Sequence, residues 1–368
     1  MAKANRKFRF LSLLLRWSIL FFSVIVLVSY LSPILSPEKY WWIALLGLTY
    51  PFLVFILFIL LALSFIFRWK TRWWLMVVFI IGLPIHGRFF AWNMPQNKDD
   101  KALKLMSYNV RLFDVYNWIQ DKKPEETRDE ILGYIKNESP DVFCVQEFYS
   151  DRSSNPFINS EKIVETGNFT DYHQQLVIET IKKDFGIAIF TKLPVLERGV
   201  VGDKSPSIFC IYVDVLYEQD TVRIYNTHLR SVRFQLEDYK FFNESPLDFD
   251  GQTNGLKSII KKLKNAYPAR VEQANAILKH ALESNREVII CGDFNDTPAS
   301  YVYNLFYNQF NDAFKESAFG FGRTYVGKVP AGRIDYIFHS SKLVVENFGI
   351  QKQVLSDHLA IKAYFSVN

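Results

Sequence analysis

Polar side chains that can do chemistry follow several apolar runs of this sequence. The clearest case is residues 292–296, Gly-Asp-Phe-Asn-Asp, which come directly after the apolar run 288–291. Val and Ile favour a strand, and apolar residues at consecutive positions indicate a strand buried on both faces. Such a strand presents the oxygen atoms of Asp293 and Asn295 at its tip. Taken alone, the pattern also fits a strand followed by an ordinary Asx turn.

The same pattern recurs along the chain. Six apolar runs end in, or lie beside, a carboxylate, an amide or an imidazole: Asn109, Glu147, His228, Asp293 with Asn295, Asp335, and Asp357 with His358. Burying unpaired charges is costly, so these groups must pair with one another, with a metal ion or with a ligand. We therefore expect them to converge on one site.

The side chains of this set favour chemistry with a hard metal ion. Carboxylates and amides without thiolates suit Mg²⁺ or Mn²⁺ rather than structural zinc. The imidazoles of His228 and His358 have the chemistry to stabilise an oxyanion or to move protons. The sequence holds neither a Gly-x-Ser-x-Gly nucleophile elbow nor a P-loop. This combination fits direct attack of water on a phosphorus centre.

The elements that must position these groups are mostly strands. Residues 268–283 and 127–137 have the spacing of helices. Residues 230–267 are polar and irregular, which fits a lid, a surface helix or a solvated insertion. The composition and patterning of the remaining runs predict strands at residues 103–109, 142–147, 185–191, 207–215, 221–227, 288–291, 333–339 and 359–366.

Six short motifs carry a resemblance to a known family. In chain order they are Ser-Tyr-Asn-Val-Arg at 107–111, Val-Gln-Glu at 145–147, Asn-Thr-His-Leu at 226–229, Gly-Asp-Phe-Asn at 292–295, Arg-Ile-Asp-Tyr-Ile-Phe at 333–338 and Ser-Asp-His at 356–358. By these motifs and their order, residues 101–368 resemble the endonuclease/exonuclease/phosphatase superfamily of DNase I-like proteins. The resemblance implies an α/β (α+β) fold, a four-layer sandwich of two mixed β-sheets flanked by helices, with the site at one sheet edge.

The resemblance also implies which residues act at the metal and on the water. Glu147 is the expected principal ligand of Mg²⁺ (or Mn²⁺), Asn109 assists at the metal, and Asp357 is a second carboxylate there. Asp293 is expected to orient or deprotonate the attacking water. Asn295 is expected to hold that water or the phosphate.

The remaining roles concern the phosphate group itself. By the same resemblance, His228 stabilises charge that builds on the phosphoryl oxygens, and His358 contacts the scissile phosphate. Asp335 is expected to fix the tautomer of His358, as a carboxylate does for a paired histidine. Arg111 and Arg333 lie beside the motifs and are candidate phosphate contacts.

The basic character of the chain belongs to its N-terminus. Residues 1–92 hold ten Lys or Arg and one acid, a net charge of +9, and the whole chain is +5, which leaves −4 for the rest. A mildly acidic domain is a poor general binder of polyanions, because such binding draws on a surplus of Lys and Arg. The three cysteines lie inside apolar runs and predict buried thiols, not a disulfide framework or a zinc site.

The N-terminal 92 residues are expected to form a transmembrane anchor. Residues 18–35 and 41–67 each reach the roughly 20 residues that cross a bilayer, and residues 73–92 are a weaker third candidate. No small-residue cleavage site follows the first run, so an anchor fits better than a signal peptide. Residues 93–101 have the composition of a linker, and residues 102–368 are the expected catalytic domain.

The distribution of basic residues predicts the orientation in the membrane. Lys and Arg precede the first run and separate the second from the third, which places both segments in the cytoplasm. If residues 73–92 span, the catalytic domain lies outside the cytoplasm; if they lie in the interface, it is cytoplasmic. We expect a multi-pass protein of the cell (inner) membrane with an extracytoplasmic catalytic domain.

Together these features predict a membrane-anchored, Mg²⁺-dependent phosphoesterase that hydrolyses phosphodiester or phosphomonoester bonds. The alternative is a catalytically inactive binding or scaffold domain of the same fold. Within the enzyme interpretation, a nucleic acid, a nucleotide and a phospholipid headgroup all stay open as substrates. An anchor favours the lipid, because tethering raises the effective concentration of membrane substrates. No protein partner is inferable.

Overall fold

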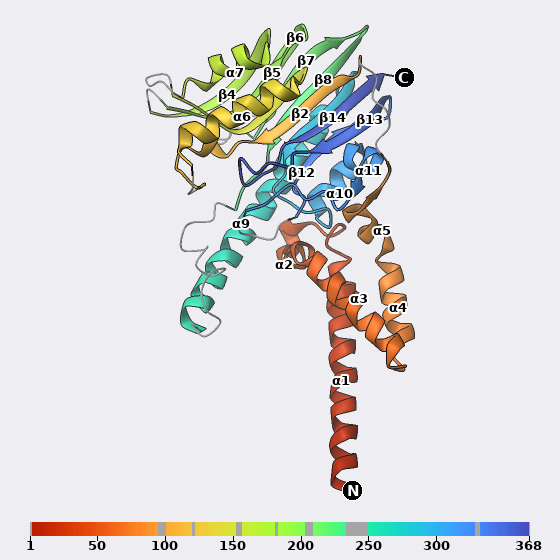
Figure 1. Ribbon diagram of the computed structural model, residues 1–368. Helices are drawn as coiled ribbons and strands as arrows, with labels where there is room; N and C mark the ends of the chain where they lie inside the picture. Colours follow the sequence, from red (N-terminus) through yellow and green to blue (C-terminus); the bar gives the residue numbers. More distant parts are fainter. Residues whose placement is uncertain are drawn as a thin grey trace.

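Two β-sheets pack face to face above a group of apolar helices (Figure 1). The computed structural model describes residues 2–94, 101–119, 122–151, 157–180, 183–202, 209–232, 249–327 and 332–367. Most of the expected linker, residues 95–100, and the segment 233–248 of the expected insertion lie outside the described residues.

The first sheet has six strands in the order β13-β14-β2-β3-β5-β4. Its central pair, β2 and β3, is parallel, and its other neighbours are antiparallel. In this parallel pair Asn109, the last residue of β2, lies opposite Gln146, and β3 continues to Asp151. The strands are β2 (Leu103–Asn109), β3 (Val142–Asp151), β4 (Asp171–Thr180), β5 (Lys183–Thr191), β13 (Leu343–Ile350) and β14 (Ile361–Val367).

The second sheet also has six strands, in the order β10-β12-β9-β8-β7-β6. Here β8 and β9 are the parallel pair, and β12 is antiparallel to β9 on its other side. The strands are β6 (Val195–Val200), β7 (Cys210–Tyr217), β8 (Asp220–His228), β9 (Glu287–Asp293), β10 (Asn311–Asp312) and β12 (Asp335–His339). The expected pair of mixed sheets is confirmed.

Apolar side chains pack the layers together. One buried cluster, which includes Leu105, Cys144 and Ile289, fills the space between the two sheets. A second packs α6 (Pro124–Glu138) and α7 (Asn159–Gly167) on the outer face of the first sheet. A third packs α9 (Phe249–Leu282) and α10 (Tyr301–Tyr307) on the second. All three cysteines are buried free thiols, as their surroundings predict.

Helix α9 is longer than the sequence pattern indicates. The 3.6-residue spacing predicts a helix from residue 268, but the helix begins at Phe249 and runs through Pro268. Its first half extends beyond the sheets toward the N-terminal helices (Figure 1). The smaller elements are η2 (Arg111–Asp114), α11 (Ala313–Ser317) and β11 (Phe319–Gly320).

The N-terminal residues form a helical group, which packs on α9 and pairs through a short strand with β11. Its elements are α1 (Ala2–Ser29), α2 (Pro37–Leu48), α3 (Tyr50–Ile66), α4 (Arg72–Ile81), α5 (Leu83–His86), η1 (Gly87–Phe89) and β1 (Ala91–Trp92). Helices α1, α3 and α4 share a buried apolar cluster that also includes Ala299 of the sheet region. The N-terminus lies at the end of α1 farthest from the sheets (Figure 1).

The structure corrects the expectation of two to three membrane spans. Among the described residues one helix, α1, holds a stretch long and apolar enough to cross a membrane, Ser12–Ser29. The run 41–67 is divided into α2 and α3, which are bent by 52° and would count as a second span only if taken together. Pro51 at the start of α3 explains the break, because proline cannot continue the hydrogen-bond ladder of α2.

The third expected span, residues 73–92, is not one helix. Helix α4 ends at Ile81 after 10 residues, about 15 Å of helix and half of a hydrocarbon core. Gly82 and Pro84 follow, and a helix interior disfavours both residues. The end of the run, Ala91–Trp92, is a strand that pairs with β11. Residues 73–92 therefore contain no helix long enough to cross a bilayer.

Gly292 is required where β9 ends. Its φ is +138°, and a Cβ there would overlap the backbone of Thr227 on the neighbouring strand. We predict that Gly292→Ala lowers the free energy of unfolding by about 3 kcal/mol, measured by denaturant titration.

The matched control is Gly133→Ala in α6. A Cβ at Gly133 meets no atom within 4 Å, so this substitution should stabilise the helix by up to about 1 kcal/mol. Equal effects of the two substitutions would contradict the proposed close approach of β8 and β9.

Candidate active site

Three expected site residues lie side by side on neighbouring strands of the second sheet. In the parallel pairing of β8 with β9, His228 is opposite Asp293. In the antiparallel pairing of β12 with β9, Asp335 is opposite Asp293. One row across three strands therefore carries an imidazole and two carboxylates at the same edge of the sheet.

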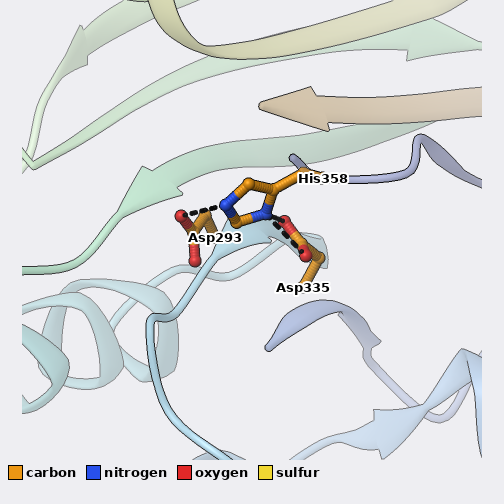
Figure 2. Close-up of side chains that lie close together, drawn as sticks. All are labelled: Asp293, Asp335 and His358. Atoms are coloured by element: carbon orange, nitrogen blue, oxygen red, sulfur yellow. Dashed lines mark hydrogen bonds and ion pairs between the residues drawn. The ribbon is translucent and has the colours of Figure 1, made fainter. Parts of the chain in front are cut away.

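His358 is inserted between the two carboxylates of this row. Figure 2 shows its ring between Asp293 and Asp335, with one nitrogen facing each. His358 Nδ1 lies 3.0 Å from Asp335 Oδ2, and His358 Nε2 lies 3.6 Å from Asp293 Oδ2. All three side chains are at least 94% buried. The loop before β14 thus supplies the fourth member of the row.

The charges around His358 keep it protonated. Burial alone would lower the pKa of His358, but the carboxylates of Asp335 and Asp293 outweigh burial and raise this pKa to about 10. Asp335 is itself held from behind, since the Thr324 hydroxyl accepts a hydrogen bond from its backbone N–H at 3.2 Å. The arrangement is a buried imidazolium with one face toward the cleft.

Glu147 reaches the same place from the first sheet. The pairing of β3 with β5 shifts register between Val145 and Phe148, and Glu147 adopts a φ of +47° at this bulge. A bulge re-aims a side chain relative to the regular pleat. The Glu147 carboxylate lies 3.8 Å from His228 Nε2. Burial raises the pKa of Glu147, and the carboxylates of Asp357 and Asp293 add to this, while His228 opposes it.

Two amides orient the carboxylate of Asp293. Asn109 Nδ2 donates to Asp293 Oδ2 at 3.0 Å and approaches Glu147 at 3.5 Å. Asn295 donates to Asp293 from both its backbone N–H, at 2.8 Å, and its side chain, at 3.2 Å. Asn295 is bent back toward Asp293 by a φ of +53°. The Nε2 atoms of His228 and His358 each lie 3.6 Å from the same oxygen, Asp293 Oδ2.

Arg111 and Asp357 face each other at the rim. Arg111 Nη1 lies 3.3 Å from Asp357 Oδ2, and the Arg111 guanidinium lies over the ring of Trp118 at 4.2 Å. Both charged side chains line the cleft. The structure therefore brings together the expected residues Asn109, Arg111, Glu147, His228, Asp293, Asn295, Asp335, Asp357 and His358.

Arg333 is the exception, and the expected phosphate contact is corrected. Its guanidinium is buried away from the cleft, where Nη1 pairs with Asp312 at 2.7 Å and Nη2 donates to the backbone oxygen of Arg88. The planar group also lies 4.4 Å from the ring centre of Phe314. Arg333 precedes β12, which begins at Asp335, so the alternation of side chains along that strand does not fix the direction of Arg333.

Two buried amides that sequence reasoning did not single out join the sheets beneath the site. Asn226 donates to the backbone oxygens of Val145 and Ala188 at 2.9 and 2.8 Å. Gln146 donates to the Asn226 side-chain oxygen at 2.6 Å. Both residues lie inside the six motifs, Gln146 directly before Glu147 and Asn226 two residues before His228, and this position is the signal that could have found them.

The site lies at the bottom of a cavity of about 280 Å³. Arg270, Tyr267 and Thr297 line it without any motif to identify them. Arg270 is held by the backbone oxygen of Arg230 at 2.7 Å and lies 3.7 Å from Asp296. The cavity also has a lining residue, Leu48, from the N-terminal helices. No local pattern in the sequence predicts a contact between these distant segments.

The donor atoms fit a divalent cation at Glu147. Among the described residues, the hydrogen-bond donor closest to this carboxylate is Asn109, at the long distance of 3.5 Å. Carboxylate and amide oxygens are hard ligands suited to Mg²⁺ or Mn²⁺. Asp293, Asp335 and His358 also place ligand atoms within 4.8 Å of one another. We favour the Glu147 side, because both nitrogens of a protonated histidine are occupied by hydrogens and cannot bind metal.

Comparison with known families gives two matches. A sequence model of the endonuclease/exonuclease/phosphatase family matches residues 106–358, which is more than half of the chain. A domain of unknown function matches residues 10–89. A search of curated protein sequences gave no match.

Solved structures share the fold at low sequence identity. An endonuclease/exonuclease/phosphatase from Bacteroides vulgatus is 16% identical, with a TM-score of 0.53 over 72% of this chain and 99% of that one. The family protein from Bacteroides thetaiotaomicron is also 16% identical, with a TM-score of 0.53 over 73% and 98%. The human Nocturnin catalytic domain, solved with a bound sulfate anion, is 16% identical, with a TM-score of 0.51 over 74% and 97%.

Proposed function

This chain belongs to the endonuclease/exonuclease/phosphatase family, and on that premise we propose that it is a divalent-metal-dependent phosphoesterase. The family hydrolyses phosphoester bonds. The observation that carries the proposal for this chain is the row of His228, Asp293 and Asp335 with His358 inserted beside it. Glu147 faces this row from the other sheet. A scaffold domain would need neither the buried charges nor the strained backbone that aims Glu147.

Asp293 is the proposed base of the reaction. Its Oδ2 atom accepts hydrogen bonds from Asn109 and Asn295, which hold the carboxylate toward the cleft. A water molecule beside Asp293 transfers a proton to the Asp293 carboxylate. At the same time the oxygen atom of this water adds to phosphorus. The bond from phosphorus to the leaving oxygen breaks, and that oxygen takes a proton from solvent to leave as an alcohol.

The imidazoles and the rim arginine stabilise the phosphoryl oxygens. Protonated His358 donates a hydrogen bond to one oxygen, and its charge is maintained by Asp335. His228 Nε2, which has no hydrogen-bond partner among the described residues, faces the same space. Arg111 is the proposed contact from the rim. Charges placed in advance where negative charge develops lower the barrier without later reorganisation.

Glu147, with Asp357, is the proposed holder of Mg²⁺ or Mn²⁺, and Asn109 assists there by directing its amide nitrogen to the Glu147 carboxylate. Such an ion supplies Lewis-acid stabilisation of the negative charge on the phosphate. It would also offset the accumulated charge of the carboxylates in the cleft.

Residues 1–92 are the proposed membrane anchor, with residues 102–368 as the catalytic domain. The support is the apolar stretch Ser12–Ser29 of α1, together with large apolar side chains that α3 exposes. The proposed extracytoplasmic active site requires α1 to be the one span, because the bent α2–α3 pair as a second span would return the chain to the cytoplasm. The Lys and Arg residues of α1 that precede the apolar stretch Ser12–Ser29 support a cytoplasmic N-terminus.

The test is hydrolysis of bis-p-nitrophenyl phosphate and p-nitrophenyl phosphate by the purified full chain. We expect turnover with Mg²⁺ or Mn²⁺ and none after chelation. Asp293→Ala should lower kcat by about 10³-fold or more, the usual loss on removal of a general base with its hydrogen bonds. Absence of turnover by the wild type on these esters, DNA, RNA and phospholipids would instead favour the inactive scaffold.

Glu147→Gln is predicted to weaken metal binding. The amide keeps the shape of the side chain but loses the charge that attracts a hard cation. We expect the dissociation constant for Mn²⁺, measured by titration calorimetry, to rise by about tenfold or more. Thermal unfolding without metal should change little and serves as the control. Unchanged Mn²⁺ affinity would remove Glu147 from the ligand set.

Asp335→Asn is predicted to slow turnover and to change its pH dependence. In the wild type, activity requires protonated His358 and is lost as the pH rises through its pKa of about 10. Without the Asp335 charge, this pKa falls toward the ordinary value of 6.5. The basic limb of kcat against pH should therefore move to lower pH, with kcat at pH 8 reduced about 10²-fold. If the variant is slow but its kcat falls at the same basic pH as that of the wild type, Asp335 does not act through His358.

A further inference from the structure

The walls of the active-site cavity differ in chemistry. Arg111, Glu147, Asp293 and His358 lie on the catalytic side. The rest of the lining includes a group of side chains that we call the apolar wall, defined as Leu48, Val232, Leu263 and Tyr267. Leu263 and Tyr267 belong to the middle of α9, and Leu48 ends α2 in the N-terminal helical group. A substrate that reaches the catalytic groups must therefore share the cavity with this wall.

The apolar wall is a built part of the fold. Helix α2 packs on α9 through a cluster of Ile259, Leu263 and Tyr267 with Leu45 and Leu48. A wall that is packed on both helices keeps its position without a ligand. The N-terminal helices thus help to shape the cavity and do not simply tether the catalytic residues.

Specific backbone contacts fix α2 against the loop that follows the catalytic strand β9. Thr297 Oγ1 donates to the backbone oxygen of Gly47 at 3.2 Å, and this contact is buried. Gly47 is needed for the close approach, because a Cβ there would overlap Ser32 and lie 3.1 Å from the backbone oxygen of Ala299. Leu48 follows directly, so its position is tied to the loop beyond Asp293.

The wall offers little to a sugar or a base. Its polar atom, the Tyr267 hydroxyl, is directed to the backbone oxygen of Ala44 at 3.5 Å. The part of the chain beyond residue 92 carries a net charge of −4, which disfavours a polyanion. An alkyl or acyl chain, by contrast, gains free energy from each methylene group that it buries against such a surface.

The outer surface of the same helical group is also apolar. Phe55 and Phe58 of α3 and Phe21 of α1 are more than half exposed. Exposed apolar surface is typical of sites that contact a membrane. The wall residue Leu48 therefore belongs to a helical group whose neighbouring helices, α1 and α3, have the surface expected of membrane contact.

From these observations we propose that the substrate is an amphiphilic phosphate ester, with its phosphate at the catalytic residues and its apolar chain against the wall of Leu48, Val232, Leu263 and Tyr267. This inference rests on the proposed phosphoesterase function and names its substrate class. It makes the N-terminal helical group a determinant of specificity, acting through Leu48.

The test uses esters that differ only in one arm. The full chain, in digitonin micelles that carry no phosphate ester, is assayed on the p-nitrophenyl phosphodiesters of methanol, hexanol and thymidine. If the enzyme acts on monoesters alone, the phosphate monoesters of the same three alcohols replace the diesters, and release of phosphate is measured. We expect kcat/KM for the hexyl ester to exceed that for the methyl ester by about tenfold or more, since each buried methylene contributes up to about fourfold.

Leu48→Ala connects the preference to the wall. We expect it to lower kcat/KM for the hexyl ester about fivefold and to leave the methyl ester unchanged. Leu48→Met, which conserves volume, should keep the preference and guards against a folding defect. Leu46→Ala is the matched control, because Leu46 is a half-exposed leucine of the same helix that does not line the cavity.

The outcomes separate this inference from the proposed function. Equal rates on the methyl and hexyl esters, or a hexyl preference that Leu48→Ala leaves intact, would overturn the inference while the hydrolase stands. A preference for the thymidine ester that Trp118→Ala abolishes would also overturn it, in favour of a base stacked at the rim. No hydrolysis of any ester would overturn the proposed function and this inference with it.

Discussion

The hydrogen bonds between the buried amides Asn226 and Gln146 are the constraint on which the site depends. The catalytic groups come from two sheets, and an apolar interface alone would allow those sheets to slide. The Asn226 side chain instead donates to backbone oxygens of both β3 and β5, and Gln146 of β3 donates to Asn226. Shifting the sheets would leave these amides unpaired in the core, at about 1–3 kcal/mol for each group. The residues that follow them, Glu147 and Thr227–His228, are held opposite each other as a result.

Unusual backbone conformations also help to direct the site residues into the cleft. Glu147 and Asn295 have positive φ angles, and Gly292 approaches its neighbouring strand too closely for any side chain. Conformations of this kind cost of order 1–3 kcal/mol each and persist only where packing enforces them. Here they direct side chains from strand ends into one cleft. The free energy lost at these positions is offset by the packed core between the sheets. The same core stabilisation also offsets the repulsion between the carboxylates that lie close together in the site.

The N-terminal helices make specific contacts with the domain that contains the sheets. Arg88 donates to Asn304 of α10 at 2.7 Å, and Ala91–Trp92 adds a short strand to β11. Helix α2 contacts both α9 and the loop after β9. A membrane anchor joined by a flexible linker would leave the active site indifferent to its presence. In this arrangement, a change in the helices reaches the cavity through Leu48.

The sequence by itself determined most of the buried strands, the polar residues near their ends and the kind of chemistry that these residues can do, whereas it did not predict β4, β6 or β13. Runs such as 103–109 and 288–291 are apolar at consecutive positions, and that local property already separates a buried strand from a loop. The order of the six motifs also indicated the family and hence the two mixed sheets. The tertiary structure decided which groups face the cleft. In the structure Arg333 is a buried partner of Asp312, and the run 41–67 is divided into two helices at Pro51. Helix α9 is longer than predicted, and Leu48 lines the same cavity as the catalytic residues. Local pattern fixes which residues are buried, whereas the direction of a side chain and its distant neighbours depend on packing between segments far apart in the chain.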